Sequence, residues 1–243
     1  MTRRLRRLDH KYGVSIVTST NRPRFFQNIL RNYRRQKYHR KELIIILNRN
    51  DMDLSKCRRR VRKYRGVKIY KVSKATSLGN CLNYGVSKSK YPLIAKFDDD
   101  DYYSRYYLRE QVKALVRKRS HIVGKHACLV YLESTRKLVI RSPWMKNKFV
   151  SLVQGGTILF RRRVFRQVRF ANTSIGEDVT FLRMSRNRGF KIYATSAYNY
   201  VYIRRKNKQS HTWKAPDRDY LSGSQRVAKT TNYRQFAECR VKL

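Results

Sequence analysis

Apolar runs of five or six residues alternate with amphipathic stretches along the first hundred residues. The runs are rich in β-branched side chains, as buried strands are. The stretches between them repeat apolar side chains three and four residues apart, as one face of a helix does. The pattern predicts strands over 14–18, 42–47, 67–72 and 93–97, helices over 23–36 and 54–64, and a third helix that opens at 76–77. This order is typical of an α/β fold with a mostly parallel central sheet flanked by helices.

The part of the chain after residue 101 is richer in strands. Its pattern predicts helices over 106–119 and 177–187, with strands over 121–123, 128–132, 137–140, 153–160, 191–194 and 198–203. No internal repeat or linker divides the chain. We therefore expect a single domain over 13–213, with a parallel half over 13–101 and a strand-rich half over 102–213. A basic extension over 1–12 precedes it, and a basic, loosely packed tail over 214–243 follows it.

Composition narrows the class of protein. With 41% hydrophobic residues, a chain of 243 residues can bury the core of one α/β domain. Its 59 Lys and Arg against 15 Asp and Glu give a net charge of +44, which must attract polyanions or anionic membrane surfaces. Together with 18 Tyr residues, this charge keeps a non-enzymatic protein that binds nucleic acid or another polyanion as an alternative.

The cellular location is limited by what the sequence lacks. The longest apolar run, 43–47, is far too short to span a membrane, and the Arg-rich start has no apolar segment of a secretory signal after it. The four cysteines have no C-x-x-C spacing, which suits a reduced intracellular protein better than a disulfide framework or a zinc site. We therefore expect a cytoplasmic protein.

Four of the few acidic residues stand in a row, Asp98, Asp99, Asp100 and Asp101, directly after the apolar run 93–97. Neighbouring carboxylates about 5 Å apart repel each other by roughly 3 kcal/mol per pair at an effective dielectric of 20. A hard divalent cation is a natural partner, because Mg²⁺ takes one or two carboxylates and completes its shell with substrate phosphates. A solvated acidic loop, attracted to the protein's own basic face, is the alternative. We favour the cation, Mn²⁺ or Mg²⁺.

Other polar residues are expected to lie near this acidic run. Thr18 and Thr20 follow the first predicted strand and Asn48 follows the second, and in parallel sheets ligands bind outside the carboxyl ends of the strands. No Gly-rich dinucleotide fingerprint and no G-x-x-x-x-G-K-[ST] motif occurs, so dehydrogenases and P-loop proteins lack their signatures here. A nucleotidyltransferase also uses Asp-held Mg²⁺, but we would expect it to carry a Gly-rich phosphate loop after the first strand, where 19–22 is not one.

Two further motifs lie in the strand-rich half. Gly155 and Gly156 either let a ligand approach the backbone closely or form a bulge or turn, and both interpretations stay open. Glu177 and Asp178 open a predicted helix, where the helix dipole favours acids whether or not they do chemistry. With the acidic run, they gather six of the fifteen acids into two clusters that would repel a phosphate backbone. Specific nucleic-acid binding is therefore disfavoured.

The motifs taken in this order resemble family 2 glycosyltransferases with the GT-A fold. The segment 14–22 is similar to the opening strand and nucleotide-contacting loop of that family, and 77–85 with 91–101 resembles the helix and strand that lead into its D-x-D metal motif. The triplets at 155–157 and 176–178 resemble its acceptor-side turn and E-D motif. With the late His-Thr-Trp at 211–213, the chain looks most like bacterial transferases of spore coats and surface glycans.

The resemblance implies a metal-dependent transfer of a sugar from a nucleotide donor, UDP or dTDP, to an acceptor hydroxyl with inversion. The half over 13–101 would bind the nucleotide, through Thr18, Thr20, Arg22, Asn48, Gly79, Asn83, Asp98 and Asp99. The cation would be held by Asp98, Asp99 and Asp100, with His211 as a late ligand. In the acceptor half over 102–213, Asp178 would be the general base, and the acceptor would be positioned by Gly155, Gly156, Thr157 and Glu177.

Two positions depart from the family pattern and leave the donor base open. Asn48 stands where many members have an acid that contacts the base, and Gly79 stands where members often have Arg. The high positive charge would hold such an enzyme on an acidic glycan or protein acceptor, on a spore coat, or on an anionic membrane surface. A polyanion-binding protein, a nucleotidyltransferase and an inactive transferase-like scaffold are the alternatives.

Overall fold

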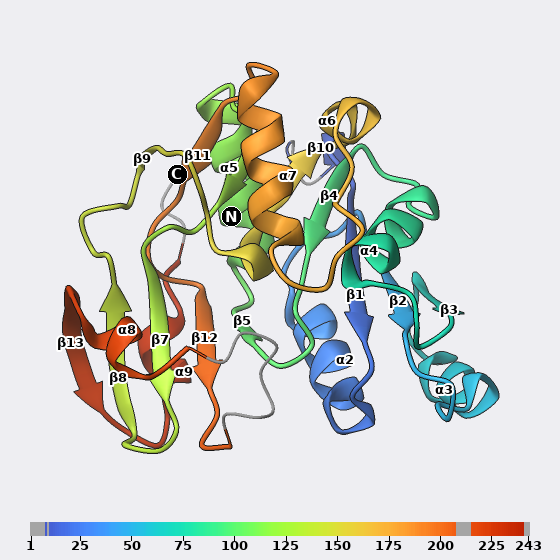
Figure 1. The fold of residues 1–243 in the computed structure, drawn as a ribbon, viewed down its shortest axis with the longest axis horizontal. Coiled ribbons are helices and arrows are strands. Elements are labelled where there is room, and N and C mark those ends of the chain that lie inside the picture. The colour runs from blue at the N-terminus through green and yellow to red at the C-terminus, as the bar shows by residue number, and fades with distance from the viewer. Residues whose placement is uncertain (1–7, 9, 208–214, 241–243) are drawn as a thin grey trace.

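A computed structural model describes residues 8, 10–207 and 215–240 of the chain. The larger of its two sheets carries the parallel strands that the sequence predicts (Figure 1). Its strand order is β3-β2-β1-β4-β10-β6-β11-β9. The first four strands of the chain are mutually parallel: β1 (Val14–Thr20), β2 (Lys41–Leu47), β3 (Val67–Lys71) and β4 (Leu93–Lys96). They end at the same edge of the sheet. The predicted strands of the parallel half are therefore confirmed.

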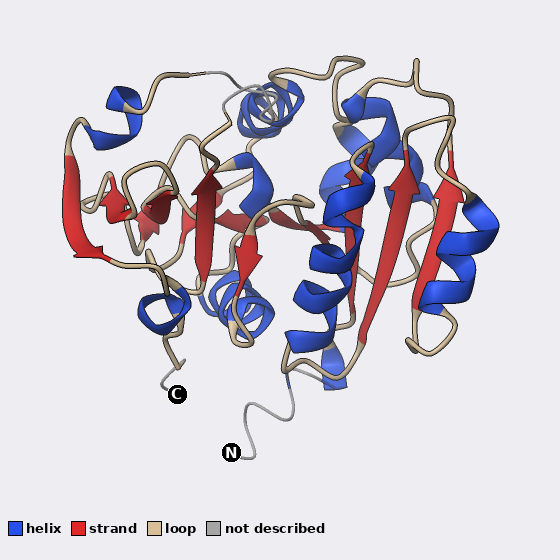
Figure 2. Ribbon diagram, turned by 90° about the horizontal axis from the view of Figure 1, so that it is seen from below, coloured by secondary structure: helices blue, strands red, loops and turns tan. Residues whose placement is uncertain are grey.

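Helices cover both faces of this sheet (Figure 2). One apolar cluster joins it to α2 (Phe26–Arg35), which follows the short turn η1 (Pro23–Phe25), to α3 (Leu54–Val61) and to α5 (Tyr107–Arg117). The other cluster joins it to α4 (Leu78–Ser87), α6 (Arg162–Gln167) and α7 (Glu177–Asn187). In the described ranges, no helix is both long and apolar enough to cross a bilayer.

The strand-rich half extends the same sheet and adds a second one. In the large sheet, β10 (Leu159–Arg161) runs antiparallel between β4 and β6 (Ile122–Gly124), followed by β11 (Ile192–Ala194) and β9 (Lys148–Phe149). The second sheet has the order β13-β8-β7-β12-β5. Its strands are β5 (Tyr102–Tyr103), β7 (Cys128–Leu132), β8 (Lys137–Arg141), β12 (Tyr200–Arg204) and β13 (Ser224–Lys229).

The strand predicted over 153–160 is only partly present. Residues Gly155–Thr157 form a 3₁₀ turn, η2, and pairing begins at Leu159. The turn closes because both the backbone N–H of Thr157 and its hydroxyl donate to the carbonyl oxygen of Gln154, at 2.9 and 2.6 Å. A threonine that bonds its own local backbone in this way favours a turn over a strand.

The prediction of a loosely packed tail over 214–243 is wrong for the part of it that the structure describes. Strand β13 pairs antiparallel with β8, between the short helices α8 (Arg218–Leu221) and α9 (Arg234–Ala237). Arg204 is fully buried and donates to the carbonyl oxygen of Ala215, and the ring of Tyr220 stacks on Tyr202 with centroids 5.4 Å apart. Side-chain anchors of this kind leave no periodic pattern in the sequence.

Candidate active site

The acidic run lies where β1 and β4 end, and basic and hydroxyl groups from the β1 side meet it there. Asp99 is 3% exposed; its Oδ2 accepts from Thr20 Oγ1 at 2.6 Å, and its carboxylate also binds the Arg22 guanidinium. Nη1 of the same guanidinium lies 3.0 Å from Asp100 Oδ2. The structure thus brings three of the expected donor-site residues, Thr20, Arg22 and Asp99, into direct contact.

Helix α2 fixes the backbone of the acidic run. Asn28 Nδ2 donates to the carbonyl oxygens of Asp99 and Asp101 at 2.8 and 2.9 Å, and Asn32 Nδ2 donates to that of Asp101 at 2.8 Å. These two asparagines were not expected from the sequence. Their spacing of four residues, which places them on one helix face, was the available signal.

Asp101 has a structural role within the run. Its carboxylate is buried and accepts from the Tyr200 hydroxyl on β12 and, at 3.0 Å, from the backbone N–H of Ile203. Burial, and then the charges of Asp100 and Asp98, raise the pKa of Asp101 well above its ordinary value. Asp101 therefore joins the two sheets.

Asp98 is the most open of the four carboxylates, with 35% of its side chain exposed. Its Oδ1 lies 2.5 Å from the Nζ of Lys96, the last residue of β4. Its backbone N–H donates at 2.7 Å to the Tyr103 hydroxyl, which in turn donates at 2.6 Å to the carbonyl oxygen of Gly156. The start of the acidic run is thus bound to the η2 turn.

The two glycines of η2 are needed because carboxylates occupy the space where their side chains would be. A Cβ built on Gly155 would overlap Asp178 Oδ2, and one built on Gly156 would lie 2.6 Å from Asp98 Oδ2. The turn interpretation is therefore confirmed, while close approach of a ligand stays a prediction, since other groups approach the backbone here. The groups are the protein's own acids. Asp98 and Asp178 are 80 residues apart in sequence, and their carboxylates lie over neighbouring residues of one turn.

The E-D motif opens α7 after Gly176, whose φ of +80° is readily adopted by glycine. Asp178 is half-buried, and its Oδ1 accepts from the backbone N–H of Val179 at 2.8 Å. Glu177 is only 4% exposed, and burial raises its pKa to about 7. The charge of Lys96 opposes this rise in the pKa of Glu177, and the charge of Asp178 adds to it.

The raised pKa of Glu177 predicts a pH-dependent difference in stability. Since the folded value of about 7 lies above the ordinary value of 4.5, the folded state holds a proton between these values that the unfolded state loses. The contribution of the protonated Glu177 to the free energy of unfolding is complete below pH 4.5 and is lost as the pH rises to about 7. Glu177→Gln should therefore gain stability relative to the wild type over that range, by at most about 3 kcal/mol. Chemical unfolding of both proteins at several pH values measures this, and parallel curves would contradict it.

The carboxylates of the acidic run are the expected ligands of Mn²⁺ or Mg²⁺. Within the described ranges, no three or more His, Cys, Asp or Glu side chains converge to hold a metal, and His211 lies outside them. Mn²⁺ or Mg²⁺ bound with substrate phosphates needs only one or two carboxylates. Burial and the charge of Asp100 raise the pKa of Asp99 to about 6 despite Arg22, so the cluster still repels negative charge. Asp98 and Asp100, with 35% and 11% of their side chains exposed, are more open than Asp99 and Asp101 and are the two that could supply such ligands.

Three of the other residues expected to bind the nucleotide form hydrogen bonds within the protein. Asn48 Nδ2 donates to the carbonyl oxygens of Ser73 and Thr76. The backbone N–H of Gly79 donates to Thr173, and Asn83 exchanges two hydrogen bonds with the backbone of Phe170. The buried hydroxyl of Thr18 has no partner among the described residues. Binding of the nucleotide by Thr18, Asn48, Gly79 and Asn83 stays a prediction.

Comparison with known proteins identifies the family. The profile described as Glycosyl transferase family 2 matches residues 15–174, more than half of the 243 residues. The chain belongs to glycosyl transferase family 2. The range matched in this family 2 glycosyltransferase takes in β1, the acidic run and η2, and it ends just before α7. No curated protein matches the chain.

Solved structures show the same fold. S. aureus TarS 1–349 superposes with a TM-score of 0.58 and 13% identity over 79% of this chain and 60% of that one. The same protein in complex with UDP-GlcNAc superposes with a TM-score of 0.64 and 14% identity, over 86% of this chain and 64% of that one. The mannosyltransferase PcManGT from Pyrobaculum calidifontis, in complex with GDP-Man and Mn²⁺, superposes with a TM-score of 0.61 and 16% identity, over 90% of this chain and 65% of that one. The GT-A-type α/β fold expected for this family 2 glycosyltransferase is confirmed, and the chain spans 60 to 65% of those structures.

Proposed function

We propose that this glycosyltransferase is metal-dependent and transfers a sugar from a nucleoside diphosphate donor to an acceptor hydroxyl with inversion. The observation that carries the proposal is the placement of Asp98 and Asp178 over adjacent glycines of η2. One carboxylate belongs to the acidic run at the carboxyl edge of the sheet, where donors bind in α/β folds. The other opens α7 on the acceptor side. A reacting sugar between them would face both.

The donor diphosphate is proposed to bind beside the acidic run. Asp98 and Asp100 would hold the cation, which supplies Lewis-acid stabilisation of the leaving diphosphate when it is bound. Arg22 keeps its positive charge at any physiological pH, and it already lies against Asp99 and Asp100. We propose that Arg22 and the Thr20 hydroxyl orient the nucleotide through the Asp99 carboxylate.

Asp178 is proposed to act as the general base. It would accept the proton of the acceptor hydroxyl as the new bond to the anomeric carbon forms and the bond to the diphosphate oxygen breaks on the opposite face. This in-line geometry gives inversion. The start of α7 suits an ionised carboxylate, because the helix dipole and the Val179 N–H both favour negative charge there. Glu177, buried behind it, would position the base.

The base of the donor is proposed to be uracil or thymine. S. aureus TarS was solved with UDP-GlcNAc and PcManGT with GDP-Man and Mn²⁺, so both kinds of donor occur on this fold. Calorimetry with Mn²⁺ and a panel of UDP, dTDP and GDP tests the proposal. Uptake of UDP or dTDP that requires the metal is the expected result. No uptake of any nucleotide by the folded protein would exclude this function.

Removal of the metal should stop turnover. EDTA should abolish hydrolysis of the accepted nucleotide sugar, and an excess of Mn²⁺ or Mg²⁺ should restore it, because the departing diphosphate needs its charge neutralised. Release of the nucleoside diphosphate measures both steps, with Ca²⁺ as a control for simple charge screening. Turnover that resists the chelator would contradict the metal assignment, and polyanion binding without turnover would favour the non-enzymatic alternative.

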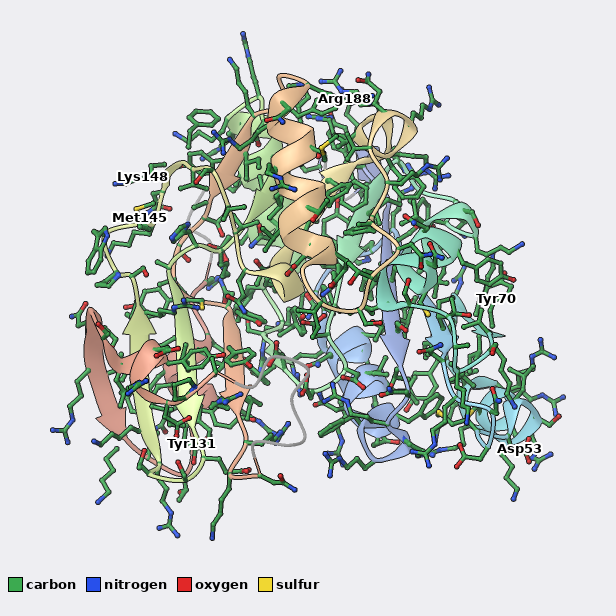
Figure 3. The ribbon with its side chains drawn as sticks, in the orientation of Figure 1. Asp53, Tyr70, Tyr131, Met145, Lys148 and Arg188 are labelled. Atoms are coloured by element: carbon green, nitrogen blue, oxygen red, sulfur yellow. The ribbon has the colours of Figure 1, made fainter. Side chains whose placement is uncertain are left out.

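The acceptor is proposed to be anionic. Side chains that end in nitrogen project around most of the outline of the molecule (Figure 3). Two hollows of about 440 and 480 Å³ adjoin at Lys63 and Tyr64, between α2 and the residues that follow α3. We call them the basic groove, because no acid lines them. Asp53 caps the opposite end of α3, with its carboxylate 2.9 Å from the backbone N of Lys56. The basic lining residues are Arg34, Lys41, Arg59, Arg60, Arg62, Lys63 and Arg65.

Charge reversal in the basic groove should weaken binding of a phosphate polymer. Arg59→Glu with Arg62→Glu should lower the affinity for polyphosphate by about tenfold or more and reduce its dependence on salt, because fewer counterions are released. Lys137→Glu with Lys229→Glu, a pair facing each other on β8 and β13, changes the net charge equally and serves as the matched control. Equal losses in both variants would show that net charge alone acts. Affinity that does not change with salt would exclude an electrostatic role.

A further inference from the structure

One buried lysine at the candidate active site has no part in the function proposed so far. Lys96 is 4% exposed at the end of β4, where its backbone N–H donates to the carbonyl oxygen of Ile158 at 2.9 Å, just beyond η2. Its Nζ lies 2.5 Å from Asp98 Oδ1. A fully desolvated ammonium is costly unless it is paired, so this lysine depends on the acids around it.

Acids from two elements act on the Lys96 ammonium. Asp98 belongs to the acidic run after β4, and Glu177 and Asp178 open α7. Burial lowers the pKa of Lys96, and the charges of Asp98, Glu177 and Asp178 outweigh that effect and raise it. Lys96 therefore keeps its positive charge beside Asp98, and the charges of the two acids of the E-D motif favour it.

The geometry leaves one oxygen of each reacting carboxylate near η2. Asp98 turns Oδ1 to Lys96 and Oδ2 toward Gly156, while Asp178 turns Oδ1 to the Val179 N–H and Oδ2 toward Gly155. Without a cation between them, the like charges of Asp98, Glu177 and Asp178 would push one another apart. The Lys96 ammonium, which is paired with Asp98 and attracted by the charges of Glu177 and Asp178, offsets part of this repulsion.

We propose that Lys96 is a positioning residue that holds the Asp98 carboxylate over η2, beside that of Asp178. It acts through these acids and makes no contact with the donor of its own. The inference rests on the proposed function for its catalytic consequence. We call Lys96, its partner Asp98 and the two acids whose charges act on Lys96, Glu177 and Asp178, the ion cluster. It belongs to the free protein and is tested without any ligand.

Thermal melts of the free protein test the ion cluster. Lys96→Met leaves three buried or half-buried acids without their cation and should lower Tm by about 6 to 20 °C. Adding Glu177→Gln removes one of the uncompensated charges and should recover part of that loss. A double variant that melts at or below Lys96→Met would overturn the cluster. If Lys96→Met does not fold, the double variant takes its place in the kinetic test below.

Kinetics with the accepted nucleotide sugar test the positioning role. Lys96→Met should lower kcat by about 100-fold, as a displacement of about 1 Å at a reacting group does. KM for the donor and the Kd for UDP with Mn²⁺ should rise by a smaller factor than kcat falls, because Asp98 is displaced while Asp100, Arg22 and Asp99 are left intact. Lys96→Arg, which keeps the charge, should recover about tenfold of the lost rate.

A second buried lysine provides the matched control. Lys125 is 0% exposed and pairs with Glu110 at 3.0 Å, with Thr195 Oγ1 and the Ser196 carbonyl also within 3.0 Å. Lys125→Met should lower Tm in the same way and leave kcat of the folded protein within about threefold. Equal kcat losses in both variants, or an unchanged kcat in Lys96→Met, would overturn the positioning role. If the wild type binds no nucleotide, the proposed function fails, and the melts still decide on the cluster.

Discussion

Replacing Asp178 by Asn should leave donor binding almost intact and lower the rate of sugar transfer by about 10²- to 10⁴-fold, the usual contribution of a general base. Asn keeps the size of the side chain and can still accept from the Val179 N–H at the start of α7. It cannot take a proton from the acceptor hydroxyl. Calorimetry with Mn²⁺ and the preferred nucleotide measures binding, and release of the nucleoside diphosphate in the presence of acceptor measures transfer.

The control for this variant is an acid outside the site. Asp219 lies in the first turn of α8, on the other sheet, and Asp219→Asn should keep both binding and transfer. Full transfer activity in Asp178→Asn would remove Asp178 as the base. Parallel losses of nucleotide affinity and rate would instead place it on the donor side of the site.

The parallel half of the fold could be predicted because each of its strands is a short apolar run between amphipathic helices. Topology then places the ends of β1 and β4 together, so contact between Thr20 and the acidic run follows from strand order. The matched family range, 15–174, covers this half and continues through η2. The fold and the enzyme class could therefore be predicted from the sequence.

The charge balance of the acidic run could not be predicted in the same way. Four aspartates in a row suggest one cation site, but the structure gives them three environments. Asp98 pairs with Lys96, Asp99 and Asp100 share Arg22, and Asp101 binds Tyr200. Arg22 and Lys96 are only two of 59 basic residues, and no periodic pattern distinguishes them. The alternative of a solvated acidic loop is wrong for Asp99, Asp100 and Asp101, which are buried, although basic side chains of the protein do pair with the run.

The described part of the C-terminal segment was missed for a related physical reason. Strand β13 is mostly polar and partly exposed, so its pairing with β8 depends on backbone hydrogen bonds and on a few buried anchors such as Tyr220. An edge strand with this composition has no alternation of apolar and polar residues to detect. Burial of Arg204 by this segment is likewise decided by three-dimensional contacts.

Glycine-to-alanine substitutions should distinguish a glycine that leaves room for the proposed base from one that packs against backbone. In Gly155→Ala, the new Cβ would overlap Asp178 Oδ2, the far end of a side chain that can rotate away. The fold should therefore survive with a Tm change of only a few degrees, while the displaced base lowers the transfer rate by about 100-fold. Circular dichroism melts and the transfer assay measure the two effects on one preparation.

Gly79→Ala provides the opposite case and completes the test. Its Cβ would overlap the carbonyl oxygen of Ala171, and the Gly79 N–H is bonded to the carbonyl oxygen of Thr173 at 3.0 Å, so backbone must move. Overpacking of this kind costs about 1 to 3 kcal/mol, or roughly 2 to 12 °C in Tm, with the rate of the folded fraction preserved. A Gly155→Ala variant that melts like Gly79→Ala, or that keeps full activity, would contradict the position of Asp178 against η2. A Gly79→Ala variant that stays stable but loses nucleotide affinity would support the predicted role of Gly79 in donor binding.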